Sequence, residues 1–415
     1  MLQRPRWRLS RIRAGSLNLR IAFVTPFVDR RHGTERAVAE LAEHLASECR
    51  HEVHIYSQRV EDVRLSQPQE IGEQTGSIRW RKIVSVSGPH IIRFLTWYRQ
   101  NRRARQKDAA RSGKKFDLVF SPGINCSDAD VILVHAVFHR LAELQKQSGD
   151  RGLRSLHRKL YYGLLCRLER KIYSDKRVIL AAVSQRTADQ LARYFGRNDV
   201  RVIPNGADLQ TFNPAARKSL RVASRERFGF SQSELVVLLL GNDWRNKGLG
   251  TLLESAAYFA ELPVRLLVVG SDDPAIWRSQ VSQLGLEQRV RFVQPSSNVL
   301  ELYAAADILA APSREDSFNL PVLEAMACGL PIVTSIDAGI AALLHHGTDC
   351  FILEHSTDST TLADYLRRLF ESESLRQSIG EQAVRTAAGF PWRKSVEEMG
   401  KLMEELNCAK YNSLA

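Results

Sequence analysis

The chain has 415 residues, 44% of them hydrophobic and 25% charged, with a formal net charge of +13. This length exceeds what one hydrophobic core usually supports, so it predicts two domains, and the composition excludes a disordered or fibrous protein. The net positive charge is confined to residues 1–210, which hold 39 Lys and Arg against 21 Asp and Glu, so we expect an anionic partner on that half only.

Residues 1–18 form a basic arm, because the first 20 residues contain six arginines and no acid. The arm lacks the apolar core of a signal peptide, and no run in the chain approaches the 18 apolar residues of a membrane-spanning helix. A disordered arm and an arm that binds an anionic surface both remain open. The six cysteines are scattered without a CxxC pair, which argues against disulfides or a zinc site and fits a reducing cytoplasm.

The first half begins with strands and helices in alternation. A near-continuous apolar run at 19–25 predicts a parallel strand that is covered on both faces. A basic loop, a helix at 35–48 and a strand at 51–57 follow, which together make a βαβ unit. Further strands are expected at 118–120, 131–135, 178–183 and 200–203.

The second half repeats this layout. We expect strands at 235–240, 264–269, 290–293, 308–310 and 332–334, a helix from about 249, and a last helix at 392–406. The fold class is therefore α/β with two doubly wound sheets, joined in the region 205–225. Such sheets bind ligands at the carboxyl ends of their strands, so we expect the ligand site between the two domains.

Several common catalytic motifs are missing from the sequence. It contains no GxGxxG, GxxxxGKS, HExxH or GxSxG, which argues against a dinucleotide dehydrogenase, a P-loop enzyme, a zincin or a lipase-type hydrolase. Asp128 and Asp130 have the spacing of a DxD metal pair. They directly precede a strand, however, so a capping or turn role is favoured and no metal is expected.

Three loops carry polar residues that apolar packing does not explain. Gly33 lies at the start of a helix, where backbone N–H groups and the helix dipole suit a phosphate. His135 ends an apolar strand, and Arg245 and Lys247 follow another strand and precede a helix. A structural His and a solvated turn are the alternatives.

A fourth loop, S-R-E-D-S-F-N-L-P-V-L-E-A-M-A-C-G-L-P at 313–331, holds three carboxylates. Pro321 suits the first helical position, so a helix is expected at 322–328, with Gly329 ending it. Glu324 would lie near its first turn, where an acid could bind ligand hydroxyls or simply complement the helix dipole. Glu315 is expected to be solvated, although it could take the place of Asp316.

Together these segments resemble glycosyltransferase family 4, which has the GT-B fold of two Rossmann-like domains facing across a cleft. The family motif E-G-F-G-L-P-x-x-E-A-M-A-x-G-x-P is similar to D-S-F-N-L-P-V-L-E-A-M-A-C-G-L-P, with Asp316 and Glu324 eight residues apart. I-P-N-G-A-D-L-Q-T-F-N-P at 203–214 resembles the interdomain motif, and G-x5-K-G at 241–248 resembles the phosphate-binding motif. The similarity covers about residues 19–395.

The resemblance implies a retaining, metal-independent hexosyltransferase that uses a UDP- or GDP-linked sugar. It assigns catalytic roles to His135 near the reacting carbon, Asp316 on the donor sugar and Lys247 on the leaving diphosphate. Glu324 would bind the ribose. The full set of donor-binding residues that it implies is Gly33, Arg245, Lys247, Gln294, Ser317, Phe318, Asn319, Leu320 and Glu324.

Three positions depart from the family pattern. Asp316 replaces the usual Glu, Asn242 stands where an Arg is usual, and His32 replaces the first of two glycines. With the basic arm at 1–18 set apart by its composition, we expect an acceptor-side domain at 19–212, a nucleotide-sugar domain at 213–390 and a C-terminal helix at 391–415 that returns toward the first domain.

The acceptor is expected on the basic half. Residues 91–115 hold nine Lys and Arg and one Asp after a cluster of aromatic residues, which is typical of a segment that lies on an anionic membrane. Trp97, Arg102, Arg103 and Arg105 are the residues expected to contact the membrane or the acceptor; a solvated basic helix is the alternative.

The first half, with S-P-G-I-N-C-S-D-A-D-V-I-L-V-H at 121–135, also resembles the lipopolysaccharide core glucosyltransferases. That resemblance implies a glycan or phosphorylated glycolipid acceptor and a cytoplasmic protein peripheral to the inner face of the membrane. A nucleotide-sugar-binding protein with weakened catalysis is the main alternative. A nucleic-acid binder is a third, less favoured hypothesis, and we expect no nucleic-acid partner.

Overall fold

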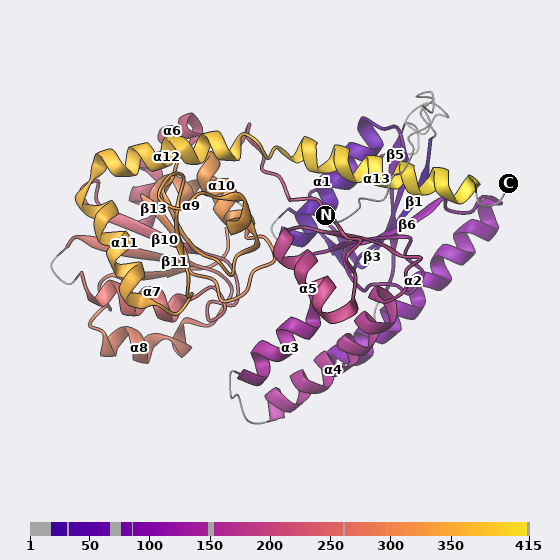
Figure 1. Ribbon diagram of the computed structural model, residues 1–415, viewed down its shortest axis with the longest axis horizontal. Coiled ribbons are helices and arrows are strands. Elements are labelled where there is room, and N and C mark those ends of the chain that lie inside the picture. The colour runs from indigo at the N-terminus through magenta and orange to yellow at the C-terminus, as the bar shows by residue number, and fades with distance from the viewer. Residues whose placement is uncertain are drawn as a thin grey trace, which may run out of the picture.

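The computed structural model describes residues 18–30, 33–66, 76–84, 86–147, 153–259, 262–296 and 298–412. Two parallel sheets, each flanked by helices, follow one another along the chain (Figure 1). The predicted α/β class with two doubly wound sheets is confirmed. The basic arm and His32 lie outside the described residues.

The first sheet has seven parallel strands in the order β5-β3-β1-β6-β7-β8-β9. They are β1 (Arg20–Val24), β3 (Glu52–Ser57), β5 (Ser77–Lys82), β6 (Leu118–Ser121), β7 (Val131–Val134), β8 (Ile179–Ala182) and β9 (Arg201–Val202). The helices of this half are α1 (Gly33–Ser47), α2 (His90–Ser112), α3 (Phe138–Gln147), α4 (Leu153–Tyr173) and α5 (Gln185–Phe195). A small sheet pairs β2 (Phe27–Val28) with β4 (Arg59–Val60).

The second sheet has six parallel strands in the order β12-β11-β10-β13-β14-β15. They are β10 (Leu235–Leu240), β11 (Val264–Val269), β12 (Val290–Val293), β13 (Ile308–Ala311), β14 (Ile332–Ser335) and β15 (Phe351–Leu353). Its helices are α6 (Pro214–Phe228), α7 (Leu249–Ala257), α8 (Arg278–Gln283), α9 (Val299–Ala305), α10 (Leu320–Ala327), α11 (Ser359–Glu371) and α12 (Glu373–Ala387). Two short 3₁₀ helices cover Pro274–Ile276 and Gly339–Leu343.

The chain passes between the two halves twice, and the two passages lie side by side. The Ala207 amide donates to the Phe390 carbonyl at 2.9 Å, and the Trp392 amide donates to the Ala207 carbonyl at 3.3 Å. A Cβ added to Gly206 would lie 2.3 Å from the Trp392 nitrogen, so only glycine fits there. The division predicted at 212/213 stays a prediction.

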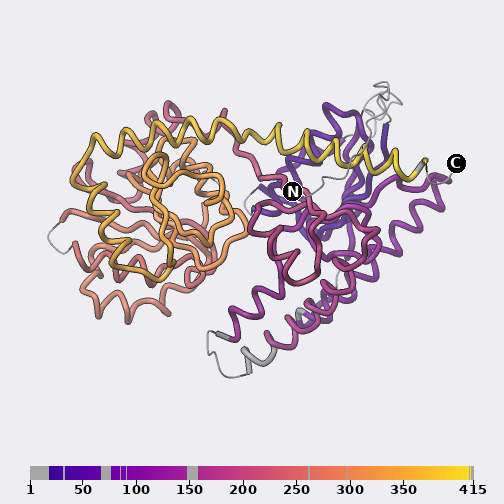
Figure 2. Tube along the Cα trace, viewed as in Figure 1, coloured from indigo at the N-terminus to yellow at the C-terminus, as the bar shows by residue number. Residues whose placement is uncertain are grey.

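The second passage leads into α13 (Trp392–Asn412), which crosses from the second half to lie along α1 (Figure 2). Gly400 of α13 faces Leu45 of α1, with 3.5 Å between an added Cβ and Leu45 Cδ2. Lys410 Nζ lies 2.5 Å from Asp130 Oδ1. The last helix is therefore part of the first half in space, although it follows the second half in sequence.

Helix α2 corrects part of the predicted membrane segment. Trp97 is 1% exposed and Arg105 is 4% exposed, and Arg105 donates to both oxygens of Asp128 at 3.0 and 2.9 Å. The prediction that Trp97 and Arg105 contact a membrane or an acceptor is therefore wrong, because both belong to the inner face of the helix. Arg102 and Arg103 are exposed, as the prediction requires.

The acidic pair beside this helix has a structural role. Asp128 pairs with Arg105, and Asp130 Oδ2 accepts the Val119 amide at 2.7 Å. These contacts are structural, but they join the segment to α2 and β6 instead of capping or closing a turn, and the expectation of no metal stays a prediction. Within the described part of the chain, no helix combines the length and apolar character needed to cross a bilayer.

Candidate active site

A cavity of about 180 Å³ lies between the carboxyl ends of the two sheets. His135 follows β7 of the first sheet, while Asp316 and Ser317 belong to the loop between β13 and α10 of the second. The lining residues are His135, Ala136, Val137, Arg140, Leu141, Gln190, Asn246, Glu315, Asp316 and Ser317. The structure thus brings His135 and Asp316 to one cavity from opposite halves.

A larger cavity, of about 650 Å³, lies at the opposite edge of the second sheet. It is lined by Leu235, Asp307 and Pro331, which stand at the amino ends of β10, β13 and β14. Sheets of this kind bind ligands at the carboxyl ends of their strands, so we place the site in the smaller cavity. Gln294 directly follows β12 and is exposed at that carboxyl edge.

The loop after β10 holds Lys247 against Asp316. Lys247 Nζ donates to Asp316 Oδ2. A Cβ on Gly241 would lie 2.8 Å from Lys247 Cε, so the lysine stem crosses directly over the Gly241 backbone. Gly248 has φ +80°, and a Cβ added to it would overlap the Pro312 carbonyl oxygen. The lack of a side chain on Gly241 therefore leaves room for the lysine stem on its path to Asp316.

The position where the resemblance leads us to expect an arginine has a structural role. The side-chain oxygen of Asn242 accepts hydrogen bonds from the amide and the hydroxyl of Ser271, both at 2.9 Å. Asn242 thereby joins the loops that follow β10 and β11. Arg245, the residue predicted to supply the missing charge, is exposed in the same loop.

Helix α10 starts at Leu320, two residues earlier than predicted, and Pro321 occupies its second position. The residue before the helix, Asn319, has φ +73°, a left-handed conformation that usually requires glycine. A Cβ on Gly33 would lie 3.4 Å from Leu320 Cδ1. The amino ends of α1 and α10 thus meet, and both present N–H groups that lack partners within their helices. The Phe318 side chain belongs to a residue that is only 2% exposed, so we expect Phe318 to offer a ligand its backbone alone.

Glu324 lies on α10 and is 4% exposed. It accepts hydrogen bonds from Arg36 of α1 and from the Tyr303 hydroxyl, the latter at 2.8 Å. Burial raises the pKa of Glu324, and Arg36 opposes that effect. Sequence reasoning missed Arg36, because its partner is 288 residues away in the chain.

His135 is 8% exposed and is held by its own strand end. Its Nδ1 lies 3.3 Å from the Leu133 carbonyl, so Nδ1 carries the proton. Nε2 has no hydrogen-bond partner among the described residues. Burial lowers the pKa of His135 to about 4. The imidazole is therefore neutral at pH 7, and Nε2 can accept a hydrogen bond from a ligand.

The expectation that Glu315 is solvated is wrong. Its side chain is 7% exposed and accepts from Arg140 Nε at 2.8 Å, Gln190 Nε2 at 2.8 Å, and Arg186 Nη2 and Nε at 2.8 and 3.1 Å. Arg186 Nη2 also donates to Asp337 at 2.8 Å. Burial alone would raise the pKa of Glu315, but these hydrogen bonds outweigh it and the pKa is lowered. The carboxylate joins the two halves.

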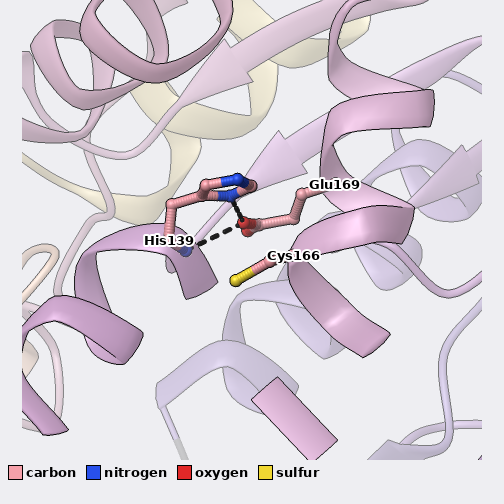
Figure 3. A group of neighbouring side chains, drawn as sticks. All are labelled: His139, Cys166 and Glu169. Carbon is pink, nitrogen blue, oxygen red and sulfur yellow. Dashed lines mark hydrogen bonds and ion pairs between the residues drawn. The ribbon is translucent and has the colours of Figure 1, made fainter. Parts of the chain in front are cut away.

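One group of possible metal ligands occurs among the described residues, and Figure 3 shows it. The ligand atoms of His139, Cys166 and Glu169 lie within 4.8 Å of one another. The Glu169 carboxylate accepts the Phe138 amide at 2.6 Å, the His139 amide at 3.0 Å and His139 Nδ1 at 2.8 Å. These bonds cap the start of α3, so we assign Glu169 to holding the beginning of this helix, which links His135 to Arg140.

Two family models match successive parts of the chain. The model described as Glycosyltransferase Family 4 matches residues 31–211, and the model described as Glycosyl transferases group 1 matches residues 221–386. A D-inositol 3-phosphate glycosyltransferase of Corynebacterium jeikeium is 31% identical over 251 residues, covering 57% of this chain and 59% of that protein. The chain therefore spans less than two thirds of the length of the curated relatives it matches.

Solved structures match almost the whole chain. WaaG, a glycosyltransferase involved in lipopolysaccharide biosynthesis, superimposes with a TM-score of 0.76 at 21% identity, covering 92% of this chain and 99% of that one. HepE of Anabaena, solved with UDP-glucose, superimposes with a TM-score of 0.70 at 18% identity, covering 93% of this chain and 100% of that one. These matches confirm the GT-B fold.

Proposed function

Because the Glycosyltransferase Family 4 and Glycosyl transferases group 1 models match successive parts of the chain, we propose that it is a retaining hexosyltransferase that uses a nucleotide-diphosphate sugar. The observation that carries this proposal is the meeting of His135 and Asp316 on one cavity, with Lys247 bound to Asp316. The binding of UDP-glucose by HepE supports a UDP-linked donor.

The geometry supports a division of roles in the donor site. Lys247 and the N–H groups at the start of α10 would neutralise the diphosphate as it leaves, which lowers the barrier where charge develops. Asp316, released from Lys247, would bind hydroxyls of the donor sugar. Glu324 would bind the ribose through the oxygen lone pairs that Arg36 and Tyr303 leave available. The reaction proposed here needs no metal ion.

His135 would act on the sugar side of the cavity. Its neutral ring presents an unprotonated Nε2, which can accept a hydrogen bond from a sugar hydroxyl but cannot donate one. Asp316 is paired with a lysine in the same cavity, so we assign it to positioning the sugar rather than to covalent attack.

The acceptor proposed is a glycan or a phosphorylated glycolipid at the cytoplasmic face of the membrane, in the assembly of lipopolysaccharide or another cell-surface polysaccharide. The exposed Arg102 and Arg103 on α2 support attachment to an anionic surface. D-inositol 3-phosphate, which names the curated relative, is a second acceptor to test.

The test is turnover with separate UDP-glucose, UDP-galactose, GDP-mannose and UDP-N-acetylglucosamine, with and without each acceptor. Nuclear magnetic resonance of the product gives its anomeric configuration. Lys247→Ala should lower turnover about 100-fold or more, the usual effect of losing one group that stabilises transition-state charge. Lys401→Ala, on the exposed side of α13, is the matched control. Full activity of Lys247→Ala, or loss of activity on adding EDTA, would contradict the proposal.

A nucleotide-sugar-binding protein with weakened catalysis is the alternative. It is favoured by the pairing of Lys247 with Asp316 and of Glu324 with Arg36, which occupies both donor-site carboxylates with protein cations. Binding of a donor without hydrolysis or transfer, for every donor and acceptor in the panel, would favour this alternative.

A further inference from the structure

We propose that Arg140, Arg186 and Gln190 form an anion-binding subsite for a phosphate group on the acceptor, and that Glu315 occupies this subsite in the structure. The inference rests on the proposed function and specifies one property of its acceptor. We call these three side chains the acceptor cradle.

The acceptor cradle is built entirely on the first half of the molecule. Arg140 lies on α3, and Arg186 and Gln190 lie four residues apart on α5, where residues at this spacing share a face. Four of their N–H groups point at the two oxygens of Glu315, at 2.8 to 3.1 Å. Forked arginine donors of this kind bind phosphate as well as carboxylate.

The cradle opens on the candidate active site. Arg140, Gln190 and Glu315 line the same cavity of about 180 Å³ as His135 and Asp316. A small acceptor that places a hydroxyl beside His135 would therefore place a neighbouring phosphate at the cradle. This arrangement would orient the acceptor by a charged group next to the one that reacts.

The charges on the cradle are neutralised from the other half of the molecule. Glu315 and Asp337 supply the negative charges that face Arg186. Within the first half, the carboxylate recorded beside Arg140 is that of Glu143, at a longer 3.7 Å. When the halves separate, the cradle therefore keeps two arginines with little compensation, and an external anion can replace Glu315.

Displacement of Glu315 would also reach the donor site. The Glu315 carbonyl accepts a hydrogen bond from Asn246 Nδ2 at 2.7 Å. Asp316 directly follows Glu315 in the chain, and Lys247 directly follows Asn246. An acceptor phosphate that replaces the Glu315 carboxylate would therefore lie one residue away from Asp316, whose backbone stays held by hydrogen bonds with Asp337 and Gly339. The other reading is that Glu315 only joins the two halves and that no ligand enters the cradle.

Inorganic phosphate is the probe that separates these readings. UDP is kept at saturation so that phosphate does not bind at Lys247, and phosphate binding is measured by calorimetry. In wild type, Glu315 occupies the cradle, and this internal competition lowers the apparent phosphate affinity by the fraction of molecules whose cradle is open. In Glu315→Ala the cradle is vacant, so phosphate should bind about tenfold more tightly than to wild type. Glu315→Gln, which keeps the side-chain volume, should shift affinity in the same direction and serves if the alanine variant fails to fold.

The gain must depend on the cradle itself. Adding Arg186→Ala to Glu315→Ala should abolish it, whereas adding Arg193→Ala, an exposed arginine of the same helix, should leave it intact. Equal phosphate affinity of wild type and both Glu315 variants, or a gain that survives Arg186→Ala, would overturn the inference.

Two sources of phosphate are compared on the variant that shows the gain. Preferential binding of soluble glycerol 3-phosphate would identify a small phosphorylated polyol, and preferential binding of vesicles with phosphatidic acid would identify a lipid headgroup; either supports the cradle. UDP binding is recorded on the same samples. A chain that binds UDP but shows no phosphate gain refutes the cradle alone, while a chain that binds no nucleotide or nucleotide sugar refutes the proposed function.

Discussion

Replacing Glu169 should destabilise the first half of the molecule and leave the second half unaffected. The buried carboxylate satisfies two backbone N–H groups at the start of α3 and the Nδ1 of His139. Glu169→Ala leaves these donors without a partner at a fully buried position, which costs about 2–5 kcal/mol in total for lost capping and unsatisfied groups. For a half of this size, the melting temperature should fall by about 10 °C.

The effect should depend on pH. Burial raises the pKa of Glu169 despite its hydrogen bonds. A carboxyl whose folded pKa lies above its unfolded value contributes stability below the unfolded pKa, and this contribution is lost as the pH rises through the folded pKa. Differential scanning calorimetry should therefore show a smaller advantage of wild type over Glu169→Gln at about pH 8 than at about pH 4.

A matched substitution separates capping from metal binding at the same group. Cys166→Ala removes the third possible ligand but none of the hydrogen bonds that Glu169 accepts. We expect it to change the melting temperature far less than Glu169→Ala, with no response to zinc or EDTA in either protein. A zinc-dependent rise in the wild-type melting temperature that Cys166→Ala abolishes would refute the capping assignment.

Three further predictions concern other parts of the molecule. Gly206→Ala should lower the free energy of unfolding by about 1–3 kcal/mol, since the added Cβ would overlap the Trp392 backbone. An unchanged melting temperature would show that the two passages of the chain are not in contact. Asn319→Ala should lower stability by about 1–3 kcal/mol, because it keeps the left-handed backbone and loses the buried hydrogen bond to Ser313, and Asn319→Gly, which loses the bond but relieves the backbone, should lower it less; the same thermal measurement decides. Changing Arg102 and Arg103 together to Glu should weaken binding to anionic vesicles by about 1 kcal/mol for each positive charge removed. A sedimentation assay measures this binding, and equal binding of variant and wild type would exclude α2 as the attachment surface.

The fold was predictable because parallel strands covered on both faces read as apolar runs. The runs that became β1, β10 and β11 were identified for this reason. Strand β5 was missed because S-I-R-W-R-K alternates apolar and charged residues at the edge of the sheet. Strand β15, of three residues, was also missed.

The errors on α2 come from counting charges without following the helical period. Trp97, Asn101 and Arg105 recur every four residues and form the buried face, where Arg105 is held by Asp128. The exposed basic residues lie between them. A test of the period along this segment would have separated the two faces.

The contacts across the cleft could not be predicted from the sequence. Glu315 is separated from Arg186 by 129 residues and from Arg140 by 175. Nothing in the local sequence distinguishes such a buried acid from a solvated one, because its burial depends on how the two halves meet.

The paired passages near Gly206 and Pro391 limit the motions open to the two halves. A single connecting strand would allow one body to swing and twist about many axes. Two strands joined by hydrogen bonds between Ala207 and its partners resist twisting, so rotation about one line remains the easiest displacement. If the halves open, we therefore expect a motion close to one coordinate, which would return His135 and the proposed acceptor cradle to the same lateral alignment with Asp316 on closing.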